Sequence, residues 1–354
     1  MTPQDEMNPR KRESAPLSRR EVLAYTAAFG GAFMAAQGLA TDAPAGAKDP
    51  AAAAARRKPG KKYDMKKSIN LWALPYPQKM TLKECLELCK EAGFDGVELN
   101  YADEGEISPK ASRADLKAIG AVARKTGLEV SGVCSFLFWP YSLTHEDPKR
   151  RQKGLELATA IIHAAPLLGT ENVLVVPGAV YVPWIPEDPP VPFEVCDRRA
   201  REAMGRLIPE AEKARVYLNV ENIFINAFLH TPQEMVQFVD SFHSNRVRVH
   251  FDTGNIAQYH FPEHWIPLLG KRIKNVHVKE YSKRVHEFNL DTFRPLLDGT
   301  TNWPAVLEAL DAVGYRGHLT FEYFRPLEHW PEALVWQTSD ALDRMLGRKG
   351  GARG

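Results

Sequence analysis

Four acidic or imidazole residues lie near the ends of short apolar segments in the second half of the chain. Glu221 ends LNVE (218–221), Asp252 ends VHFD (249–252), His277 lies within NVHVKE (275–280), and Glu322 lies within LTFEY (319–323). Three carboxylates and one neutral imidazole form a hard, mostly oxygen ligand set that leaves coordination positions for a substrate. These residue types predict one divalent metal ion. Mn²⁺ or Mg²⁺ is favoured, and Co²⁺ or Zn²⁺ is compatible with the same ligands.

Side-chain alternation along a strand gives a reason for these groups to share one space. In a closed barrel, the residues that point outward pack against helices and are apolar, so the residues between them point inward. Apolar Leu218 and Val220 therefore place Glu221 inside, and the same pattern holds for the other three ligands. It also places these residues inside: Asn70, Trp72, Glu98, His250 and Lys279. Charges buried at this density require a counter-ion, which a metal cation would supply.

A purely structural interpretation of the same residues remains open. The four side chains could form buried ion pairs with Lys279 and His250 and serve only as a polar core. Their shared inward direction favours the metal. His250 itself fits better as a neutral, hydrogen-bonded neighbour of the site than as a ligand.

The elements that would position these residues alternate regularly from residue 68 onward. Short β-branched or apolar segments alternate with longer amphipathic ones. We expect strands at 69–73, 96–100, 130–135, 172–176, 217–222, 248–252, 275–279 and 318–322. We expect helices at 82–92, 113–125, 149–168, 198–214, 232–242, 265–271, 303–313 and 332–346.

This order predicts an α/β fold with a parallel sheet, because each helix must carry the chain back across the strands. Eight such units in about 290 residues favour a closed (β/α)₈ TIM barrel. Barrel enzymes keep their active sites at the C-terminal ends of the strands, where the acidic and imidazole residues fall. A doubly wound open sheet is the alternative, but no glycine-rich phosphate loop follows the first expected strand.

Composition limits the classes of partner. The 354 residues include 46 Lys and Arg against 44 Asp and Glu, for a net charge of +2. This balance gives no reason to expect nucleic acid or a membrane surface as a partner. The four cysteines include no C-x-x-C pair, so we expect free, partly buried thiols at Cys85, Cys89, Cys134 and Cys196. The oligomeric state is left open, including a homo-oligomer.

The first 45 residues have the features of an export signal. A basic segment (10–12) precedes SRREVL (18–23), and after Glu21 no charge occurs before Asp42. The paired arginines and the Ala- and Gly-rich apolar stretch resemble a twin-arginine signal, which would carry the folded protein to the bacterial periplasm. We expect residues 1–45 to be cleaved, leaving no membrane span; an uncleaved anchor is the alternative. We expect residues 46–62 to form a disordered linker and residues 63–348 to form the barrel.

Six segments occur in a characteristic order along the chain. They are GFDGVELN (93–100), LNVENI (218–223), HFDTGN (250–255), IKNVHVKE (273–280), LLDGTTNWPAVLEALDAVGY (296–315) and LTFEY (319–323). Together they resemble the landmarks of the sugar phosphate isomerase/epimerase family, whose fold is the xylose isomerase-like TIM barrel. The resemblance extends from about residue 68 to residue 346.

The resemblance implies a metal-dependent sugar isomerase or epimerase that acts on a small carbohydrate. In the ketose 3-epimerase branch the ligands on successive late strands are Glu, Asp, His and Glu, which fall on Glu221, Asp252, His277 and Glu322. The two glutamates would act as an acid/base pair on opposite faces of a substrate that passes through a metal-stabilised enediolate. Lys279 would bind a hydroxyl or the developing oxyanion. Further substrate contacts are predicted for Glu98, Trp72, Asn255, His250 and Arg284, although Trp72 could equally serve packing.

Two positions depart from the ketose 3-epimerase pattern and leave the exact sugar open. Asn255 stands where those enzymes carry a His, and their substrate-binding Arg has only an approximate match in Lys283 or Arg284. Two other functions therefore compete: a lyase or hydrolase of 3-keto sugars or glycosides, and a non-catalytic sugar-binding barrel. The Pro-rich segment 181–193 predicts either a rigid lid over the pocket or a surface or subunit contact.

Overall fold

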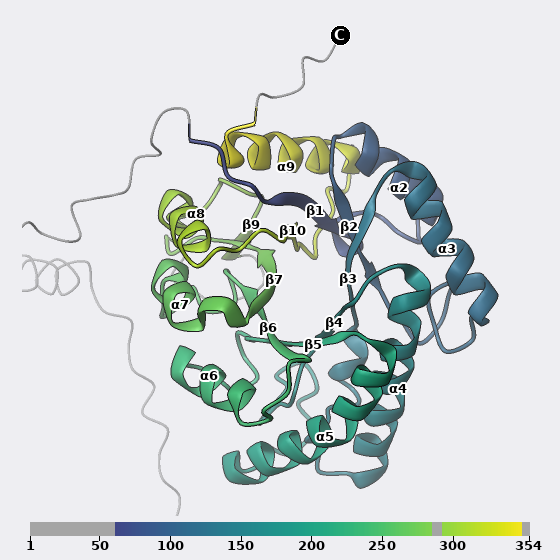
Figure 1. Cartoon of the computed structure of the whole chain (residues 1–354), viewed down its shortest axis with the longest axis vertical. Helices are drawn as coiled ribbons and strands as arrows, with labels where there is room; N and C mark the ends of the chain where they lie inside the picture. Colours follow the sequence, from purple (N-terminus) through teal and green to yellow (C-terminus); the bar gives the residue numbers. More distant parts are fainter. Residues whose placement is uncertain (1–60, 285–291, 349–354) are drawn as a thin grey trace, which may run out of the picture. The chain divides into compact units, whose positions relative to one another are not determined.

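Helices surround a closed ring of strands in the computed structural model, which describes residues 61–284 and 292–348 (Figure 1). The ring consists of β1 (Lys66–Asn70), β2 (Gly96–Asn100), β3 (Glu129–Cys134), β4 (Asn172–Val175), β5 (Tyr217–Glu221), β6 (Val247–Asp252), β7 (Ile273–Val278) and β10 (His318–Phe321). Its order is β1-β10-β7-β6-β5-β4-β3-β2, and neighbouring strands are parallel. The predicted (β/α)₈ barrel is therefore confirmed, and the alternative of an open sheet is wrong.

The helices that follow the strands begin at clear sequence signals. They are α2 (Leu82–Glu91), α3 (Arg113–Thr126), α4 (Pro148–Leu168), α5 (Phe193–Ala214), α6 (Pro232–Asp240), α7 (Pro262–Leu269), α8 (Trp303–Ala312) and α9 (Pro331–Leu346). Capping boxes begin α2, α3 and α6, where Thr81, Ser112 and Thr231 accept from the backbone three residues later. Helix α5 begins five residues before the predicted start, directly after Pro192. Helix α7 ends at Leu269 rather than at residue 271, because Gly270 leaves the helical conformation.

The outer face of the barrel is apolar, as side-chain alternation predicts. Val220, Val249, Val276 and Phe321 are all 0% exposed and belong to one continuous hydrophobic core. The residues between them point into the barrel, and many of these are polar and equally buried. The barrel interior is therefore a polar space enclosed by an apolar shell, and this arrangement positions the site.

The first strand differs from its prediction. β1 ends at Asn70, and residues Leu71–Ala73 form a short 3-10 helix, η1, instead of continuing the strand. The Asn70 side chain ends the strand because its Oδ1 accepts a hydrogen bond from the backbone N–H of Trp72 at 2.8 Å. The predicted assignment of Trp72 to the first strand is therefore wrong, and alternation along the strand does not set the direction of its side chain.

A small antiparallel sheet above β7 was not predicted. It pairs β8 (Glu280–Tyr281) with β9 (Phe293–Arg294). The buried carboxylate of Glu280 holds the segment that follows β9: it accepts from Trp303 Nε1 at 2.6 Å and from the backbone N–H groups of Leu297 and Thr301. Glu280 thereby fixes the DGTTNW segment (298–303) that connects this sheet to α8.

The described chain starts slightly before the predicted barrel boundary. Lys61 Nζ lies 2.7 Å from Glu308 Oε2 in α8, so the last residues of the predicted linker already contact the fold. The predicted signal (1–45) and residues 46–60 of the predicted linker lie outside the described residues.

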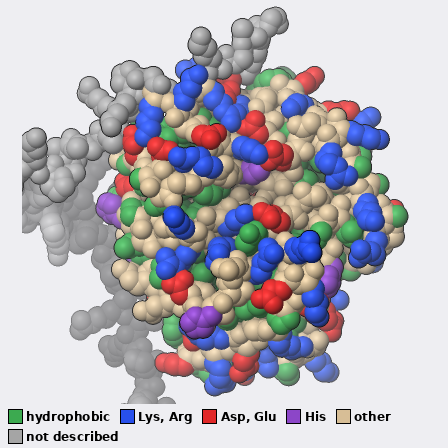
Figure 2. Space-filling model, in the orientation of Figure 1, with side chains coloured by type: hydrophobic (Ala, Val, Ile, Leu, Met, Phe, Trp, Pro, Cys, Tyr) green, Lys and Arg blue, Asp and Glu red, His purple; other side chains and the backbone are tan. Residues whose placement is uncertain are grey.

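Within the part that is described, no helix has the length and apolar character needed to cross a bilayer. On the face seen in Figure 2, Lys and Arg side chains are interspersed with Asp and Glu.

Candidate metal and sugar site

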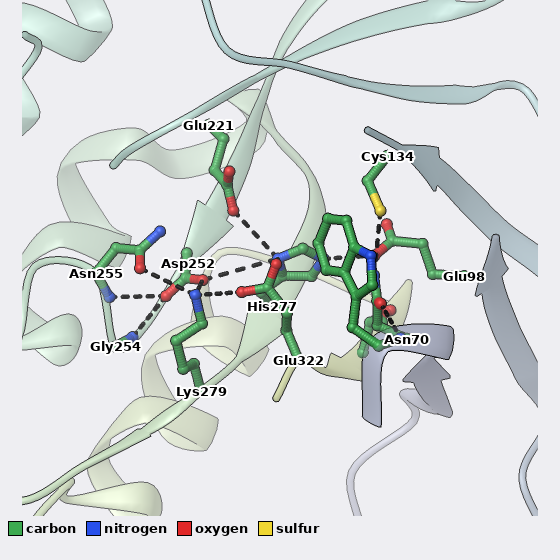
Figure 3. Close-up of polar contacts among 12 residues, drawn as sticks. Asn70, Glu98, Cys134, Glu221, Asp252, Gly254, Asn255, His277, Lys279 and Glu322 are labelled. Carbon is green, nitrogen blue, oxygen red and sulfur yellow. Dashed lines mark hydrogen bonds and ion pairs between the residues drawn. The ribbon is translucent and has the colours of Figure 1, made fainter. Parts of the chain in front are cut away.

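The four predicted ligands converge where β5, β6, β7 and β10 end. One ligand atom from each of Glu221, Asp252, His277 and Glu322 lies within 4.8 Å of the other three. His277 Nδ1 lies 3.2 Å from Glu221 Oε1, 3.5 Å from Glu322 Oε1 and 3.7 Å from Asp252 Oδ2 (Figure 3). These four strands are consecutive in the ring, so inward residues at their ends are neighbours. The structure therefore brings together the four residues that side-chain alternation placed inside the barrel.

Lys279 joins the same cluster from the residue after β7. Its Nζ lies 3.0 Å from Asp252 Oδ2, donates to Asn255 Oδ1 at 3.0 Å and contacts Glu322 Oε2. Asn255 in turn donates from Nδ2 to the backbone oxygen of Asn222 at 2.9 Å. The ammonium group therefore lies between two of the candidate ligands, as the ion-pair interpretation expected.

Burial and neighbouring charges shift the acid groups in different directions. Burial raises the pKa of Glu221 to about 7, with Glu322 and Asp252 adding to the shift and His277 opposing it. Burial also raises the pKa of Glu322, against the opposing effect of Lys279. For Asp252, by contrast, Lys279 and His277 outweigh burial and lower the pKa to about 2. Without an added cation, the cluster thus favours the ionised form of Asp252, whereas Glu221 and Glu322 resist ionisation.

The donor set fits a divalent cation. Four buried carboxylates, the three ligands and Glu98, face Lys279 and His277, and the neighbouring His250 has its pKa lowered by burial. In the metal-free protein burial would lower the pKa of His277, but Glu98 and Glu322 more than offset this and hold it well above its usual range. A cation would replace that ring proton at Nδ1 and relieve the repulsion that raises the pKa of the two glutamates. Three oxygens and one nitrogen match the ligands predicted from the sequence.

A cavity lies directly over Glu221, Lys279 and Glu322. Asp252 and His277 are 0% exposed and are not among its lining residues. Trp72 and Asn255 line the cavity, as their predicted substrate contacts require. The sequence reasoning did not identify these further lining residues: Ser135, Phe136, Trp139, Leu174, Val176, Ile223, Phe224 and Phe324. The order FLFW directly after the third strand was the signal available for Phe136 and Trp139.

Aromatic side chains form the outer part of the cavity. Trp72, Phe136 and Phe324 contact one another with ring centroids 4.5 to 5.6 Å apart. On another part of the wall, Trp139 packs against Trp184 at 4.9 Å. Trp184 belongs to the Pro-rich segment 181–193, which therefore contacts the wall of the cavity. This contact fits the lid interpretation of that segment better than a surface role remote from the pocket.

Glu98 and His250 do not lie where their predicted substrate contacts require. Both are 0% exposed, and neither lines the cavity. Glu98 Oε2 lies 2.6 Å from His277 Nε2, on the side of the imidazole that faces away from the three carboxylate ligands. The His250 ring packs edge-on against His277 at 4.0 Å, and burial lowers the pKa of His250 to about 3. Neither side chain reaches this cavity, because inward side chains lower in the barrel are covered by those above them, and their contact with substrate stays a prediction.

His250 also differs from the hydrogen-bonded neighbour expected of it. Neither of its ring nitrogens has a hydrogen-bond partner among the described residues. The sequence reasoning missed Asn222, which fixes the backbone of the candidate ligand Asp252. Its Nδ2 donates to the Asp252 backbone oxygen at 2.8 Å, and its Oδ1 accepts from the Asp252 N–H at 3.0 Å.

Arg284 and Lys283 lie away from the cavity. Both are exposed, and neither is among the lining residues. Lys283 Nζ donates to the backbone oxygen of His260 at 3.1 Å and lies over the ring of Phe261. Arg284 immediately precedes residues 285–291, which are outside the described part of the chain. The structure therefore gives no contact between the predicted substrate arginine and the site.

A family model and two curated relatives match this chain. The family model, described as xylose isomerase-like TIM barrel, matches residues 86–340. An L-ribulose 3-epimerase from Mesorhizobium japonicum is 26% identical over 248 residues, covering 69% of this chain and 75% of the relative. A D-psicose 3-epimerase from Enterocloster bolteae is 23% identical over 283 residues, covering 74% and 86%.

Solved structures show the same fold at low sequence identity. A structure of L-ribulose 3-epimerase has a TM-score of 0.66 at 20% identity and covers 80% of this chain and 95% of its own. The 3-keto-D-glucoside 4-epimerase from E. coli has a TM-score of 0.63 at 18% identity and covers 79% and 99%. These structural similarities concern the barrel itself.

Proposed function

Because the chain belongs to the xylose isomerase-like TIM barrel family, we propose that it is a divalent-metal-dependent sugar isomerase or epimerase. One observation carries this proposal. Glu221 and Glu322 reach the same cavity from β5 and from the end of β10, two strands that β6 and β7 separate in the ring. Two carboxylates that approach one substrate from separate strands can act on different faces of it. The epimerase names of the matched relatives support this class of reaction.

The proposed mechanism assigns a role to each residue that reaches the cavity. A divalent cation held by Glu221, Asp252, His277 and Glu322 would polarise the substrate carbonyl and stabilise negative charge on its oxygen. One glutamate removes the proton from the carbon beside the carbonyl, and the other returns a proton from the opposite face, which inverts that carbon. Lys279 Nζ stabilises the oxygen that becomes negative during proton removal.

The lining of the cavity supports a neutral carbohydrate as substrate. Trp72, Phe136 and Phe324 offer apolar aromatic faces on which the C–H surface of a sugar ring can pack. Lys279 is the cation among the described lining residues, and it is already paired with Asp252 and Glu322. A phosphate group would therefore meet one lysine, already paired, and no arginine in the described lining. We infer that the substrate is an unphosphorylated sugar.

Deuterium exchange tests the proposed reaction directly. The protein is loaded with Mn²⁺ and incubated in D₂O with D-psicose, D-tagatose, D-fructose, L-ribulose and 3-keto-glycosides, and the sugars are followed by NMR. We expect deuterium at the carbon beside the carbonyl and the appearance of the stereoisomer or the aldose–ketose isomer, with EDTA abolishing both. Sugar binding without exchange would indicate a non-catalytic barrel. Elimination or hydrolysis products would indicate a lyase or hydrolase.

We propose that the enzyme acts in the periplasm after export by the twin-arginine route. The motif that supports export, SRREVL (18–23), lies outside the described residues, so the proposal rests on the sequence. Fractionation of a bacterial host that expresses the chain tests it. We expect periplasmic protein, and cytoplasmic retention when Arg19 and Arg20 are both replaced by Lys; equal export of this variant would contradict the route.

A further inference from the structure

Glu98 contacts the candidate ligand His277 from behind, on the side away from the three carboxylate ligands (Figure 3). Its Oε2 lies 2.6 Å from His277 Nε2, and both side chains are 0% exposed. β2 carries Glu98 and is separated from β7 by β1 and β10, so this contact crosses the barrel interior. Glu98 is not among the residues that line the cavity.

The two nitrogens of His277 face different groups. Nδ1 faces Glu221, Glu322 and Asp252, whereas Nε2 faces Glu98. A nitrogen that binds a metal must offer its lone pair, so the proton of the neutral ring has to reside on Nε2. We propose that Glu98 is a positioning residue that accepts this proton in a hydrogen bond and fixes both the tautomer and the ring orientation of His277. The inference rests on the metal site of the proposed function.

Glu98 is itself held in place by its surroundings. Asn70 Nδ2 donates to Glu98 Oε2 at 2.6 Å, and Asn70 Oδ1 accepts from the Trp72 backbone N–H, which orients the Asn70 amide. On the other side of the carboxylate, Gly132 leaves room for it: a Cβ at residue 132 would lie 2.9 Å from Glu98 Oε1. The strand end at Asn70 and the glycine in β3 together hold the Glu98 carboxylate against His277.

A second metal ion is the competing explanation for Glu98. Ligand atoms of Glu98, His250 and His277 lie within 4.8 Å of one another, and neither ring nitrogen of His250 has a hydrogen-bond partner among the described residues. However, two atoms bound to one ion at about 2.1 Å in tetrahedral geometry lie about 3.4 Å apart. The 2.6 Å separation of Glu98 Oε2 and His277 Nε2 is that of a charge-assisted hydrogen bond. The geometry thus favours one ion with Glu98 behind its histidine ligand.

Metal affinity tests the role of Glu98 without reference to turnover. Metal-free wild type, Glu98→Ala and Glu98→Gln are titrated with Mn²⁺, and free Mn²⁺ is measured by electron paramagnetic resonance. We expect Glu98→Ala to weaken binding about 10- to 100-fold. Glu98→Gln should recover part of the loss, because its amide oxygen can still accept from Nε2–H. Nitrogen NMR of the Mg²⁺-loaded wild type should show the His277 proton on Nε2.

A matched control separates this role from the general effect of losing a buried carboxylate. Glu280→Gln removes a carboxylate of equal burial that bonds to Trp303 and lies outside the cluster, so its Mn²⁺ affinity should equal that of wild type. Wild-type affinity in both Glu98 variants would overturn the inference, as would an unprotonated Nε2. Two ions per wild-type chain, with one lost in Glu98→Ala, would instead make Glu98 a ligand. Failure of wild type to bind Mn²⁺ would refute the metal site itself.

Discussion

The two glutamates that reach the cavity have the same chemistry but different surroundings. Lys279 contacts Glu322, whereas Glu221 has His277 Nδ1 as its nearest charged neighbour. Burial raises the pKa of both, and to about 7 for Glu221. Their roles as acid and base therefore depend on which one holds a proton when the sugar binds, and single-residue substitutions can separate the roles.

Replacing either glutamate by glutamine should abolish proton exchange while the barrel remains folded. Glu221→Gln and Glu322→Gln keep the side-chain volume but remove the group that accepts the proton, so we expect turnover to fall at least about 10²- to 10⁴-fold. Circular dichroism and thermal unfolding report the fold, and deuterium incorporation in D₂O reports the first proton transfer. Retained turnover in both variants would count against their acid/base roles.

Metal binding should depend on pH through the same groups. The cation needs ionised Glu221, whose pKa lies near 7 when metal-free, and an unprotonated Nδ1 on His277, whose pKa is also raised. We therefore expect Mn²⁺ affinity to increase as pH rises through about 7 and to level off once both groups are deprotonated. Titrations across this range measure the slope. Affinity that falls with rising pH would contradict the assignment.

Metal binding should strengthen as pH rises, but the raised pKa of Glu221 should make the metal-free fold less stable as pH rises. Its pKa in the fold, about 7, exceeds the ordinary glutamate value of 4.5, so the folded state holds the proton more tightly. Its contribution to stability is present below about pH 4.5 and is lost as pH rises toward 7. Denaturant unfolding at several pH values, compared with Glu221→Gln, isolates this contribution.

At the scale of elements, the ends of β6 and β7 approach each other closely at Gly254. A Cβ at Gly254 would lie 2.8 Å from both the backbone oxygen and Cγ of Lys279. Gly254→Ala should therefore displace Lys279 or the backbone that follows β7, destabilising the fold by about 1–3 kcal/mol. Denaturant unfolding measures this loss, and turnover should fall with it because Lys279 moves.

Gly205 supplies the control for that substitution. It lies within α5, and a Cβ there would have nothing within 4 Å. Gly205→Ala should stabilise the protein by about 0.5–1 kcal/mol, because alanine loses less backbone entropy in a helix. If both substitutions changed stability equally, the close approach at Gly254 would not be the cause.

At the scale of the whole molecule, the metal should act as a cross-link within the barrel. Its proposed ligands come from β5, β6, β7 and the end of β10, so one ion would tie together half of the ring. An ion at 100 times its Kd should stabilise the fold by about 2.7 kcal/mol if it binds only the native state. Thermal unfolding with Mn²⁺ and with EDTA measures the shift, and Asp252→Asn should reduce it. Identical melting curves under both conditions would contradict a metal centre at these residues.

The order of strands and helices could be predicted because it depends on local patterns. Apolar alternation identified each strand of the barrel, and longer amphipathic segments identified the helices between them. The exceptions also have local causes. Asn70 ends β1 by binding the Trp72 N–H, and the pairing of β8 with β9 joins segments of two residues, too short to leave a periodic signal.

The sequence by itself determined which residues face into the barrel, because alternation along a strand depends only on the pattern of apolar neighbours. It therefore identified Glu221, Asp252, His277 and Glu322 as candidates for one cluster. The depth of each inward residue was decided only by the tertiary structure, since depth depends on strand register and on which side chains lie above. Register places Glu98 behind His277 rather than in the cavity, and the segments that follow β1, β3 and β10 bring Trp72, Phe136 and Phe324 together. These contacts join segments far apart in the chain, so no local pattern encodes them.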